Sequence, residues 1–417
     1  MESEAIKVVN ELLIIIGTLM VVGVFIAKMA EIVKVPDVVL FLIVGILIGP
    51  SMLSIVDLPG ESVANQLILA FGSALILFHG GMSLDLKVLK GVWKTIVLLA
   101  TVGVVITTVV TGYAAMMFLG LPLVTALLLA AVIASTDPAT LIPVFQQIKI
   151  KERVSQTVLS ESAFNDATGA ILTMSLVGIV ATGTFSVSTS ILSFLTMTGW
   201  GLMAGLVVGF VVAYLIAHIK VGVFRSFAPV MSVIAVLAAY LSAVKLGGSG
   251  YMAVFVAGII LGNLQTFKLT LSEKHSEEQN TFLENLALVM RMFIFILLGA
   301  QVNFQIIQQY WLAGIGVVLV FMLVARPLTV LASALPDRTA RWAKNEMLFM
   351  FWVRETGVIP AALAGILIGL KVPYADVIAS ITFMAILGTI LIQASTTKQV
   401  AKKLGLLLEK TGISTGA

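Results

Sequence analysis

The chain consists of apolar runs, most of them long enough to cross a membrane, joined by short polar connections. A helix needs about 20 predominantly apolar residues to cross roughly 30 Å of hydrocarbon. The pattern predicts thirteen spans, at residues 10–33, 37–56, 65–81, 92–119, 122–147, 153–182, 190–219, 228–245, 250–266, 279–302, 310–335, 344–370 and 375–397. We therefore expect an all-α polytopic membrane protein with about 13 transmembrane helices.

Two of these runs are interrupted by polar residues at their centres. In 122–147 the interruption is Ser-Thr-Asp-Pro, in which Pro138 removes a backbone donor and disfavours helical geometry at Asp137. The run 344–370 is interrupted by Arg354 and Glu355. We expect two broken helices whose free carbonyls and half-helix ends face a cavity.

The interruptions belong to a longer internal correspondence. Residues 41–53 align with 254–266, 74–85 with 294–304, and 134–145 with 353–363, in the same order and at a nearly constant offset. A single linking span, the seventh, lies between the two halves, and it makes their topology in the membrane inverted. Inverted repeats are a recurrent plan of secondary transporters. The expected division is a first repeat at 1–182, a linking helix at 183–225, a second repeat at 226–397 and a short cytoplasmic tail at 398–417.

Composition agrees with a membrane environment. The chain is 59% hydrophobic and 11% charged, with a mean hydropathy of +1.11, far from the values of soluble domains. It has no cysteine, which excludes disulfides and thiolate metal sites, and its three histidines are too few for a metal cluster. We expect no enzyme activity, no cofactor and no nucleic-acid partner.

Positive charges alternate between the connections. One set of connections holds only Lys7, Lys245 and Lys371. The other set holds Lys28, Lys34, Lys87, Lys90, Lys94, Lys149, Lys151, Arg153, Lys220, Arg225, Lys268, Lys274, Arg338, Arg341, Lys344, Lys398, Lys402, Lys403 and Lys410. By the positive-inside rule, we expect a multi-pass protein of the cell inner membrane, with the N-terminus outside and the C-terminus cytoplasmic.

Three acidic residues, Asp137, Glu161 and Asp166, lie in segments that are otherwise apolar. Acidic side chains at membrane depth are costly and usually mark an ion or proton path. In the sixth span Glu161 with Asn165, and Ser162 with Asp166, are four residues apart and lie on adjacent rows of one helix.

A cation site can be assembled from this pattern. Asp166 and Asp137, with the hydroxyls of Thr136 and Ser162, supply the hard oxygen ligands that Na⁺ or K⁺ prefers. A carboxylate removed from water is unstable as a free ion, so it is discharged either by a proton or by a cation. Competition between the two for one carboxylate is already an exchange mechanism. Asn165 carries no charge and is expected to pack or to hydrogen-bond the broken helix.

Three arginines, Arg291, Arg326 and Arg354, lie inside spans. Arg326 needs a buried anion, and Glu161 is the most available one. Arg354 either neutralises the adjacent Glu355 or offsets helix-end charges across the twofold of the repeat. A buried ion pair of this kind is better evidence for structural specificity or gating than for a net gain in stability.

At these residues the chain resembles the monovalent cation/proton antiporter superfamily. It is most similar to the branch with an Asn-Asp pair in the sixth span, the NhaP-type sodium/proton antiporters and the animal sodium/proton exchangers. The stretches that carry the resemblance are ASTDPAT, SESAFNDATGA, the Arg-Pro of the eleventh span and the arginine of WVRETG.

The resemblance implies an NhaA-like antiporter fold, with a six-helix core domain that moves as an elevator against a dimerisation domain in a homodimer. Asp166 would carry the ion and the proton, with Asp137, Thr136 and Ser162 as its neighbours. Glu161 would pair with Arg326. Asn165, where electrogenic relatives have a second aspartate, would imply one-for-one electroneutral exchange of an alkali cation (Na⁺, or else Li⁺ or K⁺) for H⁺.

Three positions depart from the family pattern. His79 stands where many relatives have an acidic residue, and we consider both a pore-lining and a pH-sensing role for it. Arg291 lies on the helix where electrogenic relatives place a lysine near the ion, which weakens the electroneutral interpretation. The usual Gly-Leu-Arg-Gly of the twelfth span reads Val-Arg-Glu-Thr-Gly here, which leaves the role of Glu355 open.

Other functions remain as alternatives. Within transport, these are a K⁺/H⁺ efflux antiporter and an electrogenic exchanger. An intramembrane aspartyl protease also uses two membrane aspartates, but the Tyr-Asp and Gly-x-Gly-Asp pairs that it needs are absent from the sequence. A channel needs a filter-like loop, and the sequence shows none. Two broken helices in inverted repeats favour alternating access instead.

Overall fold

The computed structural model describes residues 4–33, 35–60, 62–182, 187–218, 222–302 and 304–408. Three lysines used in the charge pattern, Lys34, Lys220 and Lys410, lie outside these ranges. In the described part of the chain the elements are helical, apart from an isolated bridge between Ile150 and Leu407. The prediction of a helical polytopic membrane protein is confirmed by this architecture.

The first part of the chain forms helices that match the first six apolar runs. They are α1 (Glu4–Val33), α2 (Asp37–Ile48), α3 (Val63–Met82), α4 (Leu86–Ala100), α5 (Val102–Leu119), α6 (Leu123–Ala134), α7 (Pro138–Gln147) and α8 (Glu152–Thr182). The run 92–119 begins earlier than expected, at Leu86, and is divided at Thr101. The run 37–56 stops being helical at Ile48, because Gly49-Pro50 starts a series of turns.

The remainder matches the later runs. It comprises α9 (Val187–Ala217), η1 (Arg225–Phe227), α10 (Ala228–Lys245), α11 (Gly250–Gly262), η2 (Leu264–Phe267), α12 (Glu273–Ala300), α13 (Phe304–Val320), η3 (Phe321–Ala325), α14 (Arg326–Ala334), α15 (Lys344–Trp352), α16 (Val358–Gly369), α17 (Ala375–Gly388), η4 (Thr389–Ala394) and α18 (Ser395–Lys403). The elements η3 and η4 are π-helical turns inside long helices. The expected start of the tail, residue 398, falls inside α18.

Length and hydropathy single out the membrane-spanning candidates. Within the described ranges, nine helical segments are long and apolar enough to cross a membrane, and α2, α6, α11 and α16 are shorter apolar helices. Two of these shorter helices, α6 and α16, are halves of the interrupted runs, as the polar interruptions predict. The number of thirteen crossings and the inverted relation of the two halves stay predictions.

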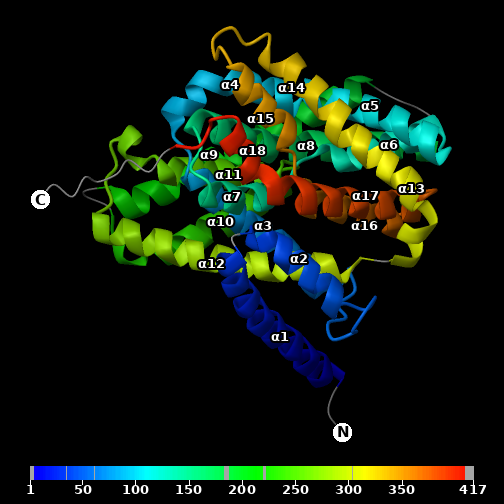
Figure 1. Cartoon of the computed structure of the whole chain (residues 1–417). Helices are drawn as coiled ribbons and strands as arrows, with labels where there is room; N and C mark the ends of the chain where they lie inside the picture. Colours follow the sequence, from blue (N-terminus) through cyan, green and yellow to red (C-terminus); the bar gives the residue numbers. More distant parts are fainter. Residues whose placement is uncertain are drawn as a thin grey trace, which may run out of the picture.

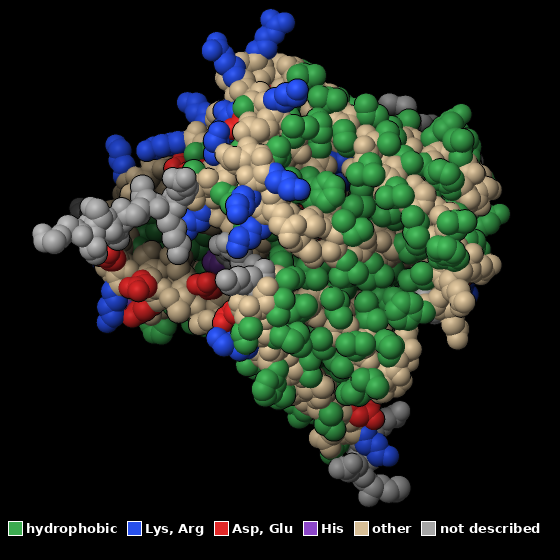
Figure 2. Space-filling view, viewed as in Figure 1, with side chains coloured by type: hydrophobic (Ala, Val, Ile, Leu, Met, Phe, Trp, Pro, Cys, Tyr) green, Lys and Arg blue, Asp and Glu red, His purple; other side chains and the backbone are tan. Residues whose placement is uncertain are grey.

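The outer surface has two distinct regions. Figure 2 shows Lys and Arg side chains gathered over the end of the molecule where the C-terminus lies, beside a wide hydrophobic belt. In Figure 1 the apolar helix α1 projects from the rest of the molecule, with the N-terminus at its far tip. Only 11% of its most apolar window is buried inside the protein. Such a surface suits contact with lipid or with another protein.

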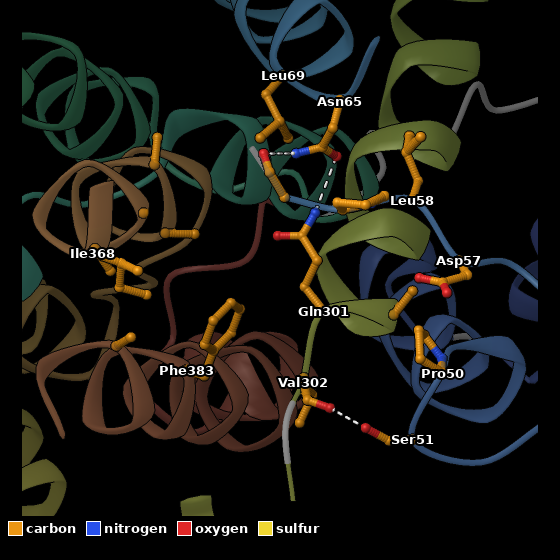
Figure 3. A pocket seen from close by; sticks show the side chains of 18 of the residues that line it. Pro50, Ser51, Asp57, Leu58, Asn65, Leu69, Gln301, Val302, Ile368 and Phe383 are labelled. Carbon is orange, nitrogen blue, oxygen red and sulfur yellow. Dashed lines mark hydrogen bonds between the residues drawn. The ribbon is translucent and has the colours of Figure 1, made fainter. Parts of the chain in front are cut away.

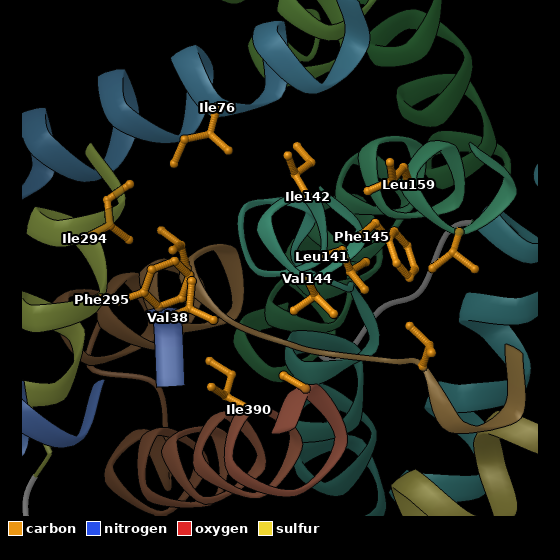
Figure 4. Close-up of a cluster of buried hydrophobic side chains, with 14 of the residues drawn as sticks. Val38, Ile76, Leu141, Ile142, Val144, Phe145, Leu159, Ile294, Phe295 and Ile390 are labelled. Carbon is orange, nitrogen blue, oxygen red and sulfur yellow. The ribbon is translucent and has the colours of Figure 1, made fainter. Parts of the chain in front are cut away.

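The interior around the broken helix α7 is apolar. Figure 4 shows Ile142 and Phe145 of α7 in one cluster with Ile76 of α3, Phe295 of α12 and Ile390 of η4. All five side chains are at most 8% exposed. This cluster joins the broken helix to the helices of the other half of the molecule.

Helices α3 and α11 approach each other so closely that glycine is required at the contact. A Cβ atom on Gly258 would meet the main-chain carbonyl of Phe78, and one on Gly81 would meet the carbonyl of Phe255. Close backbone approach through small residues is the usual way in which helices associate in membranes. The packing of α3 on α11 therefore depends on these two positions.

We expect Gly258→Ala to destabilise the protein by about 3 kcal/mol, because the obstacle is backbone and the helices must separate. The measurement is unfolding of the purified protein in mixed detergent micelles. Gly17→Ala on α1, where a Cβ would meet nothing within 4 Å, is the matched control. It should be neutral or stabilising by up to about 1 kcal/mol. Equal stability of the two variants would contradict the close contact.

Candidate ion-binding site

The two interruptions lie where the sequence places them. Helix α6 ends at Ala134, Ser135 is extended, and α7 begins at Pro138. Helix α15 ends at Trp352, Val353 is extended, and α16 begins at Val358. Each interruption leaves peptide groups without helical partners in the interior of the protein.

The two interruptions satisfy each other's backbone. The amide of Asp137 donates to the carbonyl of Glu355 at 2.9 Å, and the hydroxyl of Thr356 donates to the carbonyl of Ser135 at 3.1 Å. The amide of Val358 donates to Asp137 Oδ2 at 3.2 Å. These bonds join segments more than 200 residues apart, and we call residues 135–137 with 353–357 the crossing.

Asp137 lies between two helix N-termini. It immediately precedes α7, and its carboxylate accepts from the first amide of α16 and from the hydroxyl of Thr140. The N-terminal ends of helices carry partial positive charge, so both helices stabilise the ionised carboxylate. Asp137 is thus a structural part of the crossing as well as a potential ligand.

Arg354 contacts the C-terminal end of a helix, where the partial charge is negative. Its guanidinium donates to the carbonyl of Ala134 at 2.5 Å, at the C-terminus of α6, and to the hydroxyl of Thr107 at 3.0 Å. It also lies over the ring of Phe321, 4.7 Å from the centroid. Of the two expectations for Arg354, the geometry favours the helix-end contact. Its side-chain partners are these groups and not Glu355.

Glu161 and Arg326 form a buried ion pair. Two bonds of 2.5 and 3.0 Å join the guanidinium to both carboxylate oxygens, and Arg326 Nε donates to the carbonyl of Met350 at 2.7 Å near the end of α15. Arg326 is 0% exposed and Glu161 1%. The structure therefore contains the contact that the sequence suggested, and it ties α8 to α14 and α15.

Helix α8 is tied to the first interruption through Thr136. Asn165 accepts from the amide of Thr136 at 3.1 Å and donates to its hydroxyl at 2.8 Å. That hydroxyl donates to Ser162 Oγ at 2.9 Å. Asn165 therefore hydrogen-bonds the broken helix, which is one of the two roles considered for it.

Asp166 follows Asn165 directly and is 3% exposed. Neither of its carboxylate oxygens has a hydrogen-bond partner among the described residues. Asp137 is the carboxylate within electrostatic range of it. An ionised carboxylate that is buried without a hydrogen-bond or ion-pair partner is strongly unfavourable. Asp166 is therefore the strongest candidate in the site for binding a cation or a proton.

Two of the residues singled out in the sequence lie elsewhere. Arg291 on α12 forms an ion pair of 3.4 Å with Asp37 at the start of α2, a partner that sequence reasoning did not consider. Both lie beside a cavity of about 410 Å³. His79 on α3 is half-buried, and the charged groups facing it are Arg291 and Glu284 of α12. The structure brings neither residue into the crossing.

Sequence reasoning also missed residues that border the site. Tyr251 of α11 lies within electrostatic range of both Asp166 and Asp137 and packs edge-on against Tyr240. Thr107 of α5 binds Arg354, as described above. Both lie in apolar helices without a charged residue, where no spacing or proline distinguishes them from ordinary packing residues.

A separate cavity of about 590 Å³ lies at the end of the molecule where α2 and α12 finish. Figure 3 shows Asn65 and Gln301 side by side in its lining, joined by a hydrogen bond of 3.0 Å from Gln301 to Asn65 Oδ1. Residues of α16 and α17, among them Ile368 and Phe383, line another wall. The cavity therefore reaches the half-helix that begins at the crossing.

Comparison with known proteins identifies a family over most of the chain. The family model of the transmembrane sodium/hydrogen exchanger matches residues 17–403. The chain belongs to that family. Its members are transporters and not enzymes, so the protease alternative has no support.

Curated relatives of this exchanger chain include sodium and potassium antiporters. Na(+)/H(+) antiporter 1 of Methanocaldococcus jannaschii is 32% identical, over 93% of this chain and 95% of the relative. The K(+)/H(+) antiporter NhaP of Alkalimonas amylolytica is 29% identical, over 97% of this chain and 68% of the relative. Among solved structures, the sodium proton antiporter MjNhaP1 from M. jannaschii at pH 8 superposes with a TM-score of 0.76 and 30% identity. That match covers 94% of this chain and 99% of the other chain.

Removing one partner of the Glu161–Arg326 pair should cost more than removing both. We expect Arg326→Met to destabilise the protein by about 3–5 kcal/mol, because it leaves a buried carboxylate uncompensated. The double variant Glu161→Gln with Arg326→Met should recover most of that loss. Unfolding in mixed micelles measures both. A double variant as unstable as the single one would show that the pair does not account for the effect.

Gly357 should tolerate no side chain. A Cβ there would lie 2.9 Å from Cγ of Asp137 and closer still to its Oδ2. We expect Gly357→Ala to lower the rate of cation-driven proton movement in proteoliposomes by about tenfold or more, because small displacements of reacting groups are costly. Gly365→Ala on α16, the helix that follows Gly357, has nothing within 4 Å of the added atom and should transport normally. Normal transport by Gly357→Ala would argue against the observed crossing geometry.

Proposed function

We propose that this protein is a secondary antiporter that exchanges Na⁺ for H⁺ at the crossing, with Asp166 as the carboxylate that holds either ion. K⁺ in place of Na⁺ is the second candidate, favoured by the K(+)/H(+) antiporters among the relatives. The observation that carries the proposal is the buried carboxylate of Asp166, whose two oxygens have no partner in the described residues.

The proposed cycle uses Asp166 and Ser162 of α8 together with Asp137 and Thr136 of the crossing. In the cation-loaded state, Asp166 neutralises the cation, and Asp137, Thr136 and Ser162 complete an oxygen shell. In the other state, the cation has left and one proton is bound to Asp166. Because the free carboxylate is unfavourable away from water, the site changes sides only when loaded. Exchange follows from this restriction.

Electroneutral exchange is the stoichiometry that we propose for Asp166 and its neighbours. Asn165 is uncharged and is occupied by Thr136, so it carries no second proton. Arg291, on the helix where electrogenic relatives place a lysine near the ion, is paired with Asp37 instead. One cation therefore exchanges for one proton at Asp166.

We also propose the larger framework that the sequence suggested. Alternating access occurs by elevator motion of a core built around the crossing, with homodimers in a cell inner membrane. The N-terminus lies outside and the C-terminus in the cytoplasm, which is supported by the Lys and Arg side chains at the C-terminal end of the molecule (Figure 2). The two interruptions that pair with each other support the division into inverted repeats.

The test uses purified protein in liposomes with an internal pH dye and an imposed pH gradient. Addition of NaCl should dissipate the gradient in the wild type, and choline chloride should not. KCl tests the second candidate in the same preparation. Asp166→Asn should reduce the cation-dependent rate to that of empty liposomes, because an amide can bind neither a proton nor a cation by charge.

Glu152→Gln, an exposed carboxylate at the start of the same helix, is the control and should transport at the wild-type rate. Imposing a membrane potential should leave the rate of an electroneutral exchanger unchanged. Unimpaired transport by Asp166→Asn, or no response to any alkali cation, would overturn the proposed function.

A further inference from the structure

A second group of buried polar atoms lies beside the crossing, where the 353–357 segment packs against η4 and α18. Glu355, Gln393 and Thr397 are all completely buried. The hydroxyl of Thr397 donates to Glu355 Oε1 at 3.4 Å. Glu355 Oε2 and both ends of the Gln393 amide have no hydrogen-bond partner in the part of the chain that the structure describes. Because buried polar atoms are nearly always hydrogen-bonded, this group indicates a ligand.

Three polar residues of η4 and α18 are spaced so that they lie along one side of the helix, beside the 353–357 segment. Thr389, Gln393 and Thr397 are four residues apart and form one stripe along η4 and α18. Thr389 accepts the amide of Thr356 at 3.2 Å, and Thr397 contacts Glu355. Gln393 lies between them on this stripe, about one helical turn from each. The π-helical turn in which Gln393 lies is a form of helix that is frequent at functional sites.

Neither arginine near the crossing forms an ion pair with Glu355, although Arg326 lies within electrostatic range of it. Arg326 spends both terminal nitrogens on Glu161. Arg354 donates to the end of α6 and to a threonine hydroxyl. A long bond from Thr397 does not compensate a buried negative charge. The Glu355 carboxylate is therefore neutralised either by a proton or by a cation from outside the chain.

We propose that Glu355, Gln393 and Thr397 form a second site for an alkali cation next to the Asp166 site. Carboxylate, amide carbonyl and hydroxyl oxygens are the hard ligands that such a cation takes. The carbonyl of Glu355 accepts the amide of Asp137 at 2.9 Å, so one backbone segment serves both sites. The inference rests on the proposed function, to which it adds a second cation per protomer.

Charge balance at the crossing agrees with two cations. In and beside the crossing, the positive charges of Arg326 and Arg354 equal in number the negative charges of Glu161 and Asp137. Asp166 and Glu355 then remain as buried carboxylates, and one cation at each makes the crossing neutral. In this arrangement the cation at Glu355 stays bound throughout the transport cycle, and the cation at Asp166 is the one exchanged for a proton.

The test is equilibrium binding of radiolabelled Na⁺ and Rb⁺ to the purified full-length protein in detergent. The wild type should bind two cations per protomer. Asp166→Asn and Glu355→Gln should each bind one, and the double variant should bind none. Glu152→Gln, outside both sites, should retain two. Each variant is checked for a single symmetrical peak in size-exclusion chromatography.

The outcomes separate the two proposals. Equal binding stoichiometry for the wild type and Glu355→Gln would overturn the second site and leave exchange at Asp166 intact. Unimpaired antiport by Asp166→Asn would overturn the proposed function. If Glu355→Gln does not fold, Gln393→Leu decides, because it removes a ligand without removing a charge. It should weaken binding of the second cation by about tenfold, and unchanged affinity would overturn the site.

Discussion

The structure depends on one constraint: two helices are interrupted in the apolar interior, and every peptide group freed there needs a partner. Water cannot provide one at that depth. The two interruptions meet this requirement by hydrogen bonding to each other, through Asp137 with Glu355 and Thr356 with Ser135. Each interruption is therefore stable only in the presence of the other, although they are more than 200 residues apart. This mutual dependence gives a rigid crossing around which ion ligands can be placed.

The charged groups near the crossing divide into those that hold it together and those left for ligands. Arg354 and Asp137 contact helix ends of opposite polarity, and Arg326 closes a bidentate pair with Glu161. These groups satisfy one another inside the protein. Asp166 has no hydrogen-bond partner among the described residues, and in the proposed mechanism its carboxylate exchanges a proton for a cation. The same division separates the structural pair at Glu161 from the proposed ion site at Asp166 on α8.

Much of this arrangement was predictable from the sequence. The proline after Asp137 and the charges of Arg354 and Glu355 in apolar runs are local signals, so they located both interruptions correctly. The pairing of Arg291 with Asp37 was not predictable, because it depends on how α12 packs against α2 across 254 residues. The approach of Tyr251 to the two aspartates likewise arises from helix packing. Sequence patterns identify which residues are costly to bury, whereas packing decides which of them meet.

The central claim is that a cation and a proton compete for Asp166. The most direct measurement is proton release when NaCl is added to the concentrated, weakly buffered protein in detergent, compared between the wild type and Asp166→Asn. Competition predicts that the wild type releases one more proton per protomer than the variant, and that the release disappears at high pH, where the carboxylate is already deprotonated. The same release from both proteins would contradict the account, because the proton displaced by the cation would then come from another group.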